Sequence, residues 1–374
     1  MKKKINYINL NTAEHLDNIW DYLNTDGWKN IHPENFEYNT LIGVLKRKEA
    51  KPVVADFLPI DKGMKWLDKE KKVLDPTYLP EIFEAGMDSF LTAARDFFNN
   101  YKDKKIGVQL SGGLDSSLII GLLKHFQIPF YLVGLTTQRY EFRTEVYVQQ
   151  ILSKWAIESI LIDYEKHLPL SNLNEAPIHQ YPDLIVNNYS SNKAMALECK
   201  RMGVEILLTG DGGDNVFGEP IPSDPKQCTW IPQSFGDTWL AENVYSPFGV
   251  DIIPFYEYEG VLDAIYNLRI GQGADSLKLW ARQFFKEYLP QELVNFNYCA
   301  DFWGLYISGL QKAIPQIEKL FKKAFELTQN HYFSKESIND LLIQDLLSAK
   351  KEIYQKIEAR IALAVWINSL NKQS

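Results

Sequence analysis

The centre of the chain alternates short apolar runs with stretches of helical periodicity. Four runs have the length and apolar character of buried strands: residues 105–110, 130–135, 159–163 and 205–209. Three stretches between them have helical spacing: residues 117–126, 144–152 and 190–202, the last ended by Gly203. Strands and helices in this succession require crossover connections. The pattern therefore predicts an α/β fold whose parallel sheet carries helices on both faces.

The regions on either side of this core differ from it and from each other. From about Trp239 onward the pattern is mostly helical, with long periodic stretches at 276–288 and 335–370. The first ~85 residues instead contain short β-like pieces at 40–45 and 53–57. We therefore predict two parts: residues 1–85, a short β-containing region, and residues 86–374, the sheet domain with a helical C-terminal lobe.

Composition excludes several classes of protein. The chain of 374 residues is 45% hydrophobic, as folded domains are, and its net charge of -8 argues against a nucleic-acid-binding surface. Lysines at 102, 104 and 105 favour a solvated start of a strand over a basic patch. No apolar run reaches the ~20 residues of a membrane helix. Cys199, Cys228 and Cys299 have no paired spacing for zinc or disulfides, which indicates a reducing cytoplasm.

The first chemical motif is the loop Ser111–Ser117, between a predicted strand and helix. Its adjacent glycines, Gly112 and Gly113, permit positive φ and close approach of phosphate oxygens to the backbone. Hydroxyl groups of Ser111 and Ser116, with the amides that start the helix, would donate to those oxygens. Asp115 beside a polyphosphate requires a hard divalent cation between them, so the loop predicts ATP with Mg²⁺. The structural alternative is a tight turn in which Asp115 or Ser116 caps the helix.

A second glycine- and acid-rich loop, residues 209–219, follows the last predicted strand of the core. Taken alone it fits a calcium-type loop or a solvated hairpin equally well. Loops that leave the carboxyl ends of parallel strands meet at one edge of the sheet. The two loops together therefore predict that Asp115 and Asp214 approach a shared phosphate chain.

Both loops resemble the synthetase domain of the asparagine synthetase family. Ser111–Ser116 matches its Ser-Gly-Gly-x-Asp-Ser pyrophosphatase loop fully. Gly210–Gly218 matches its Gly-Glu-Gly-x-Asp-Glu-x-x-Gly loop, with Asp211 and Asn215 in place of the two glutamates. Further similar segments are Val133-Gly134-Leu135, Ile253-Pro254-Phe255-Tyr256-Glu257 and the Lys278-x-x-x-Arg282 pattern. The resemblance spans about residues 90–310 and implies the sheet of the adenine-nucleotide α-hydrolase, or pyrophosphatase-loop, type.

The resemblance also implies an activity and a set of site residues. The family makes amide bonds by forming an acyl-adenylate from ATP and releasing AMP and pyrophosphate. Its magnesium ligands correspond to Asp115 and Asp214. Its nucleotide-binding positions correspond to Leu110, Ser111, Gly112, Gly113, Ser116, Val133, Gly134, Gly210 and Lys278. Its catalytic positions correspond to Asp211, Glu257 and Lys278, for which the structural alternatives are a solvated loop at Glu257 and a surface helix lysine at Lys278.

Two departures from the family pattern change the expected reaction. Members that hydrolyse glutamine carry a cysteine where this chain has Lys2, and residues 1–85 are about half a glutaminase domain. We therefore expect no glutamine hydrolysis. The substrates would be a small-molecule or peptide carboxylate and an amine, as in β-lactam synthetases and lasso-peptide cyclases. A role in natural-product or peptide modification follows, with a linear or cyclic product.

The second departure is the loop 295–302, which has neither the family's lysine nor an arginine. Losing such a charge can cost about 100-fold in rate. Arg282, the substrate or a partner could replace it. Two other functions stay open: an ATP-binding regulatory or scaffold homologue, and another pyrophosphatase-loop enzyme, such as a tRNA-thiolating or a guanylate- or NAD-forming one. The sequence also leaves open self-association or a biosynthetic partner protein.

Overall fold

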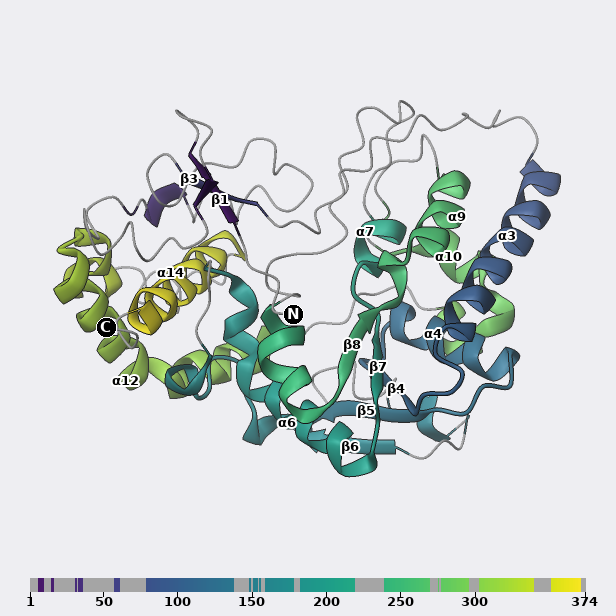
Figure 1. The fold of residues 1–374 in the computed structure, drawn as a ribbon, viewed down its shortest axis with the longest axis horizontal. Helices are drawn as coiled ribbons and strands as arrows, with labels where there is room; N and C mark the ends of the chain where they lie inside the picture. The colour runs from purple at the N-terminus through teal and green to yellow at the C-terminus, as the bar shows by residue number, and fades with distance from the viewer. Residues whose placement is uncertain are drawn as a thin grey trace.

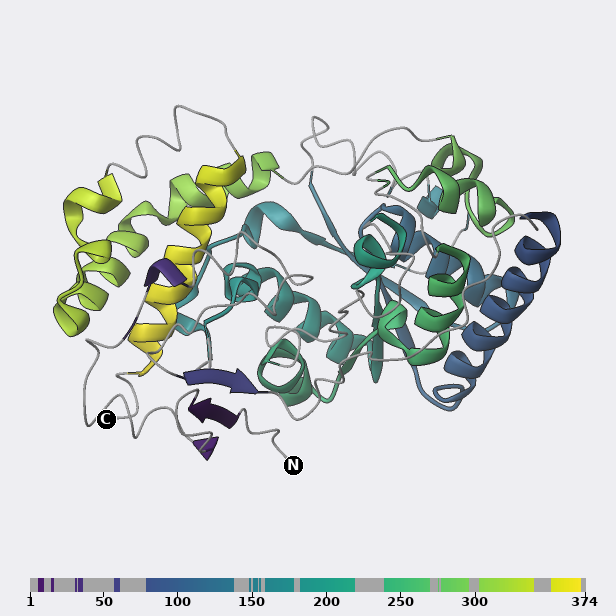
Figure 2. The same ribbon diagram turned by 90° about the horizontal axis from the view of Figure 1, so that it is seen from above.

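The computed structural model describes most of the chain from residue 79 onward and fragments before it. The described residues are 6–9, 15–16, 31, 33–35, 57–60, 79–137, 148, 151–153, 155, 159–177, 182–218, 239–269, 275, 277–295, 303–339 and 351–370. Two views of the molecule show a sheet with its helices at one end, α3 outermost, and the helices α12 and α14 at the other (Figures 1 and 2).

A five-stranded parallel sheet forms the centre of the fold, which confirms the predicted fold class. Its strands are β4 (Ile106–Leu110), β5 (Tyr131–Thr136), β6 (Ser159–Asp163), β7 (Ile206–Thr209) and β8 (Asp251–Pro254), in the order β6-β5-β4-β7-β8. The first four lie within one residue of the predicted runs. β8 was not predicted as a strand, because the segment has only two consecutive isoleucines and ends in a proline, which sheets tolerate at an edge.

The strand register places the two motif loops side by side. Leu110 at the end of β4 lies opposite Gly134 of β5, and β4 pairs with β7 from Ile106 opposite Ile206. Because all strands are parallel, the loops after β4 and β7 leave neighbouring strands at the same edge. Residues at this edge line one cavity together with residues of the helices α12 and α14.

Helices cover both faces of the sheet. One face packs against α3 (Leu79–Asn99), α4 (Leu114–His125) and α9 (Glu259–Arg269), around a cluster of buried phenylalanine rings. The other packs against α6 (Tyr189–Met202), and the buried cluster on this side continues into the lobe helices α12 (Trp303–Thr328) and α14 (Lys351–Leu370). Shorter helices are α7 (Gly213–Gly218), α10 (Leu279–Phe284), α11 (Gln291–Val294), η3 (Tyr164–Lys166), η4 (Leu173–Glu175), η5 (Leu184–Asn188), η7 (Ala241–Tyr245), η8 (Ser246–Phe248), η9 (Phe255–Glu257), η10 (Lys286–Tyr288) and η11 (His331–Phe333).

The predicted helices are found with different bounds. The stretch 190–202 is α6, and Gly203 ends it in the left-handed conformation with φ 72°. The stretch 117–126 is α4, which begins three residues earlier. Within the stretch 276–288 the helix is shorter than predicted: Lys278 has φ 53°, so α10 begins only after it and ends at Phe284. Most of 144–152 lies outside the described residues, as do residues 340–350 of the stretch 335–370, whose C-terminal part is the helix α14.

The N-terminal region contributes a small antiparallel sheet of order β2-β1-β3. Its strands are β1 (Asn6–Asn9), β2 (His15–Leu16) and β3 (Phe57–Ile60). The predicted piece 53–57 meets β3 only at Phe57, and 40–45 lies outside the described residues. The division at 85/86 stays a prediction, and α3 runs across it. No helix in the described part of the chain has both the length and the apolar character of a membrane span.

Two lysines before β4 contact residues at the starts of neighbouring strands. The Lys104 ammonium lies 2.8 Å from Glu205 Oε1, and the backbone N–H of Lys105 donates to Glu205 Oε2 at 3.1 Å. The Lys105 ammonium lies 4.6 Å from the centre of the Tyr131 ring. These contacts join the starts of β4, β5 and β7, and two of the three lysines have partners within the protein.

Replacing Glu205 by glutamine is expected to make the melting temperature less sensitive to acid. The Lys104 ammonium, and then the Lys105 N–H, hold the pKa of the Glu205 carboxyl below its usual 4.5. A carboxyl whose pKa is lowered by folding stabilises the folded chain above its unfolded pKa and loses this effect as pH falls. The difference in Tm between the wild type and Glu205→Gln should therefore be steady above about pH 5 and shrink below about pH 4.5. A difference that grows on acidification would contradict this assignment.

Replacing Gly121 by alanine is expected to lower the free energy of unfolding by about 1–3 kcal/mol. A Cβ at Gly121 of α4 would overlap the Tyr288 carbonyl oxygen and lie 2.8 Å from its carbonyl carbon. Alanine ordinarily stabilises a helix relative to glycine, so a loss in urea denaturation reports this close packing. As a control, Gly260→Ala in α9 places its methyl 3.2 Å from the tip of the Tyr258 ring, which can move. Equal stability of the Gly121 variant and the wild type would contradict the packing.

Candidate active site

The loop after β4 is closed by its own serines. Ser111 Oγ lies 3.0 Å from Ser116 Oγ, and Ser117 Oγ donates to the Gly113 carbonyl at 2.6 Å. Gly112 has φ 79°, a conformation that glycine adopts without strain. The N-cap of α4 is Gly113, and no side chain caps the helix. The alternative in which Asp115 or Ser116 caps the helix is therefore wrong.

The second loop packs directly on the first through two glycines. A Cβ at Gly213 would overlap the carboxyl group of Asp115, and one at Gly210 would lie 3.0 Å from Asp115 Cβ. The chain then continues into α7, with Asp214 in its first turn, so the hairpin alternative is also wrong. These contacts give a physical reason for glycine at both positions: any side chain there would displace Asp115.

Lys278 joins the two predicted metal ligands. Its ammonium lies 2.8 and 2.6 Å from the two carboxyl oxygens of Asp115 and 2.5 Å from Asp214 Oδ1. The Lys278 side chain is 9% exposed, that of Asp115 18% and that of Asp214 89%. Lys278 is thus a buried residue, and the surface-lysine alternative does not hold.

The position of Lys278 is set by the backbone. Its N–H donates to the Asp275 carbonyl at 2.9 Å, and the Asp275 N–H donates to the Gly218 carbonyl at 2.8 Å. These bonds tie the start of α10 to the end of α7. The left-handed φ of 53° is uncommon for lysine and costs about 1 kcal/mol or more. The fold holds Lys278 there against its local preference.

Burial and charge oppose each other in this group. Burial alone would lower the pKa of the Lys278 ammonium, but Asp115 and Asp214 outweigh it and raise the pKa above its usual 10.5. Burial raises the pKa of the Asp115 carboxyl, and the Lys278 ammonium limits that rise. Lys278 is therefore a fixed positive charge whose loss would leave a buried carboxyl group without compensation.

The two carboxyl groups also fit a divalent cation. Oxygens of Asp115 and Asp214 approach one positive charge, that of Lys278, from two loops. Mg²⁺ is usually held by one or two carboxylates, with substrate phosphates and water completing its shell. The described residues contain no group of three or more His, Cys, Asp and Glu that could hold a metal alone. The donor set therefore suits a cation that arrives with a phosphate.

The predicted catalytic acids lie near this group in different settings. Asp211 is exposed, and its Oδ2 accepts from the Thr209 hydroxyl at 2.7 Å. Glu257 is half-buried, and its side chain passes the backbone of Gly212, where a Cβ would lie 3.3 Å from Glu257 Cγ. The fully buried Tyr256, next to Glu257 in the chain, donates from its hydroxyl to the Asp115 carbonyl at 2.8 Å. Tyr256 was not singled out in the sequence, although it lies in the segment 253–257.

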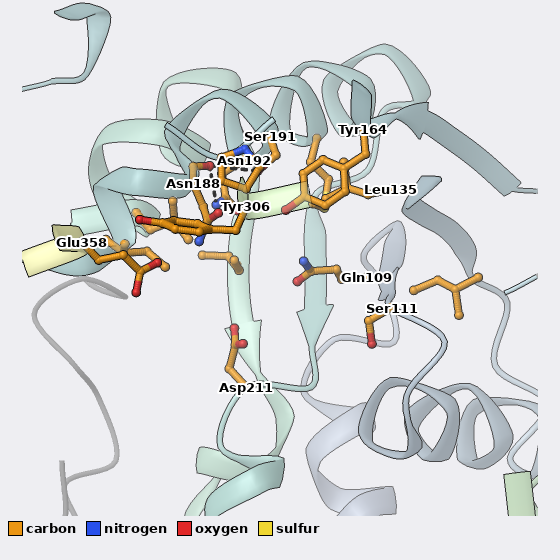
Figure 3. Close-up of a pocket in the computed structure, with 16 residues that line it drawn as sticks. Gln109, Ser111, Leu135, Tyr164, Asn188, Ser191, Asn192, Asp211, Tyr306 and Glu358 are labelled. Atoms are coloured by element: carbon orange, nitrogen blue, oxygen red, sulfur yellow. Dashed lines mark hydrogen bonds between the residues drawn. The ribbon is translucent and has the colours of Figure 1, made fainter. Parts of the chain in front are cut away.

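A cavity of about 510 Å³ opens beside the first loop, at the carboxyl edge of the sheet. Leu110, Ser111 and Asp211 of the predicted site line it (Figure 3). The side chain of Val133 is fully buried in the core, and Gly134 lies beside Leu110, so a ligand would reach these two residues through their backbone. The polar residues that complete the lining and that the sequence did not indicate are Gln109, Tyr164, Asn188, Ser191, Asn192, Tyr306 and Glu358.

The guanidinium of Arg282 is held by backbone carbonyl groups, and its charge acts on Asp115, whose pKa it lowers against the effect of burial. The Arg282 Nε donates to the Leu277 carbonyl at 2.9 Å and its Nη1 to the Leu293 carbonyl at 2.5 Å. The residue is 5% exposed, so its guanidinium joins α10 to α11. Of the loop 295–302, only Asn295 lies within the described residues.

The fold and the site define an α/β protein with a glycine-rich anion loop and paired carboxyl groups at the carboxyl edge of its sheet. The chain belongs to the asparagine synthase family, whose model matches residues 100–293. It is therefore an ATP-using ligase of the amide-forming type. The family match confirms the resemblance inferred from the two loops.

Three solved structures are similar to the chain at low sequence identity. A search of curated proteins finds no match to this chain. Among solved structures, the U34-tRNA thiolase NcsA from Methanococcus maripaludis with its 4Fe–4S cluster is 15% identical, with TM-score 0.32 over 66% of this chain and 78% of that one. NMN synthetase from Francisella tularensis is 12% identical, with TM-score 0.29 over 59% of this chain and 99% of that one. NH3-dependent NAD synthetase from Campylobacter jejuni subsp. jejuni NCTC 11168 in complex with the nitrate ion is 13% identical, with TM-score 0.31 over 68% of this chain and 95% of that one.

Proposed function

We propose that the chain forms an amide bond through an acyl-adenylate, releasing AMP and pyrophosphate. The observation that carries this proposal is the convergence of Asp115, Asp214 and Lys278 beside the Ser111–Ser117 loop and next to a ligand-sized cavity. The loop supplies amides and hydroxyls for phosphates, and the cavity offers space for an acid at the same sheet edge. Both substrates would then meet at the end of β4.

The neutral loop residues and the two carboxyl groups would bind different parts of Mg-ATP. Ser111, Gly112, Gly113 and Ser116 would bind the phosphates, and Asp115 with Asp214 would hold Mg²⁺, which supplies Lewis-acid neutralisation of phosphate charge. When the nucleotide binds, the Lys278 ammonium would move away from the two carboxyl groups and contact the phosphate oxygens instead. Because it carries the positive charge beside Asp115 and Asp214, it would also stabilise the charge that develops on the phosphates, the role of the family's loop lysine.

Two bond exchanges make up the reaction. A substrate carboxylate oxygen attacks the α-phosphorus of ATP, and the bond from that phosphorus to the bridging oxygen breaks, which releases pyrophosphate. The amine nitrogen then attacks the acyl carbon, loses a proton to a base, and AMP leaves. An alkyl amine with a pKa of about 10.4 is largely protonated at neutral pH, so a base is useful. Asp211, which lines the cavity, and Glu257 are the candidate bases.

We further propose that the reaction takes place in the cytoplasm without glutamine hydrolysis, in natural-product or peptide modification. Cys199 is the cysteine within the described residues, and it is fully buried. Burial raises its pKa to about 12, so its thiol is no glutaminase nucleophile. The nucleophile of the second step would then be an amine substrate and not ammonia released from glutamine.

The test uses hydroxylamine as a general amine. The protein is incubated with Mg-ATP, hydroxylamine and a panel of small carboxylates, and hydroxamate, AMP, ADP and pyrophosphate are measured. We expect hydroxamate, AMP and pyrophosphate in equal amounts, and no glutamate from added glutamine. ADP and phosphate would reject the adenylate route. ATP binding without AMP from any carboxylate would favour a regulatory homologue.

A further inference from the structure

The short helix α7 carries Asp214 in its first turn and is held from its other end. It spans only Gly213–Gly218, and an isolated helix shorter than about 12 residues is marginal in water. The last carbonyl groups of a helix have no partner within it. In α7 the carbonyls of Val216, Phe217 and Gly218 each accept a hydrogen bond from another segment of the chain. The orientation of Asp214 therefore depends on residues that lie far from it in the sequence.

Two of the three donors are side chains that also contact each other. Arg269 Nη1, at the end of α9, donates to the Val216 carbonyl at 2.7 Å. Trp280 Nε1, in α10, donates to the Phe217 carbonyl at 3.1 Å. The central guanidinium carbon of Arg269 lies 5.4 Å from the centre of the Trp280 ring, within the range of a cation–π contact. Arg269 is fully buried, so its charge strengthens the bond to the helix end, where the helix dipole favours a cation.

Trp280 also connects α7 to the segment that carries Lys278. It lies two residues after Lys278, and its backbone N–H donates to Asp275 Oδ2 at 3.3 Å. Its ring packs on the ring of the fully buried Phe217, with the ring centres 5.8 Å apart. One indole ring therefore joins the helix of Asp214 to the chain segment of Lys278.

We propose that Trp280 and Arg269 are positioning residues for the cation of Mg-ATP: they hold α7 so that the Asp214 carboxyl group stays beside Lys278 and can share a cation with Asp115. The proposal rests on the proposed function, in which these two carboxyl groups hold Mg²⁺. Neither positioning residue is among the described residues that line the cavity, so both would act through Asp214. Asp214 needs this support because its side chain is 89% exposed, whereas that of Asp115 is 18% exposed.

The first test measures whether the indole N–H holds α7. Trp280→Phe removes this donor and keeps an aromatic ring against Phe217. Amide hydrogen exchange is followed by mass spectrometry without nucleotide. Residues 213–218 should exchange at least about threefold faster in the variant, since losing one net hydrogen bond favours local opening by about this factor or more. Exchange in α4 should not change. Unaltered exchange of residues 213–218 would overturn the proposal.

The second test measures the effect on the cation. The affinity for ATP is determined by calorimetry with Mg²⁺ and with EDTA, and the ratio of the two affinities is compared between the variants and the wild type. In Trp280→Phe this ratio should fall at least about threefold. Arg269→Lys keeps the charge but loses the planar fork of donors, and its ratio should fall in the same direction. A role in stability alone would lower the Tm and leave the ratio as in the wild type, which would overturn the proposal.

Trp155→Phe is the matched control, because it makes the same change at another half-buried tryptophan. The Trp155 ring lies 5.7 Å from the ammonium of Lys124, in the last turn of α4, at the opposite end of this helix from the phosphate loop. Exchange of residues 213–218 and the affinity ratio should match the wild type. A ratio reduced as much as in Trp280→Phe would count against a specific role of Trp280.

The wild type separates this proposal from the proposed function. Equal affinity of the wild type for ATP in Mg²⁺ and in EDTA would reject the cation site, and the positioning role with it. A magnesium effect in the wild type that both variants keep in full would reject the positioning role and leave the cation site supported.

Discussion

Asp115→Asn is expected to lower AMP formation by about 1000-fold or more while the chain stays folded. Asp115 is the less exposed of the two carboxyl groups, and the backbone of Gly210 and Gly213 packs against it. A neutral amide of the same shape would keep this packing but could not balance a divalent cation. AMP is measured by quenched-flow in the hydroxylamine assay, with circular dichroism to check the fold.

Asp103→Asn provides the matched control for this prediction. Asp103 is exposed and lies in the turn before β4, so the same chemical change there should leave AMP formation unaltered. If Asp115→Asn retained more than about a tenth of the wild-type rate, Asp115 would have no part in binding the cation. Loss of activity in both variants would point to a general effect of net charge.

Lys278→Met is expected to lower AMP formation by about 100-fold and to make stability depend on magnesium. Without the ammonium, Asp115 is left buried beside the like charge of Asp214, and an uncompensated buried charge costs about 3 kcal/mol. Mg²⁺ would relieve this repulsion. The Tm of the variant should therefore fall well below that of the wild type in EDTA and recover largely on addition of Mg²⁺.

The wild type and Lys286→Met are the controls for this prediction. Lys286 is exposed on η10, and its removal should change neither the Tm nor its response to Mg²⁺. A Lys278→Met variant as stable as the wild type in EDTA would contradict the ion pairs. A variant that is destabilised equally with and without Mg²⁺ would contradict the placement of a cation at Asp115 and Asp214.

The parts of the site that lie on motif loops could be predicted from the sequence. Alternating strands and helices require a parallel sheet, and a parallel sheet places successive carboxyl ends at one edge. The approach of Asp115 to Asp214 follows from that rule once both loops are assigned to strand ends. The glycines at 210 and 213 then have a physical role, because they make room for the Asp115 side chain.

The distal wall of the cavity could not be predicted. Glu358 and Tyr306 reach it from helices that follow the sheet by many residues, and their periodicity indicates only that those helices are partly buried. Which helical face meets the sheet edge depends on the packing of α12 against α14 and of α14 against η5. The burial of Lys278 is a tertiary effect of the same kind, because it depends on the bonds between Asp275, Gly218 and Lys278.

The most direct test of the account is a calorimetric titration of the protein with ATP, once with Mg²⁺ and once with EDTA. If Asp115 and Asp214 hold a cation between them and the nucleotide, ATP should bind at least about 30-fold more tightly with Mg²⁺, since bare phosphates would meet two carboxylates. Asp115→Asn should abolish this difference. Equal affinity for ATP in Mg²⁺ and in EDTA would contradict the account.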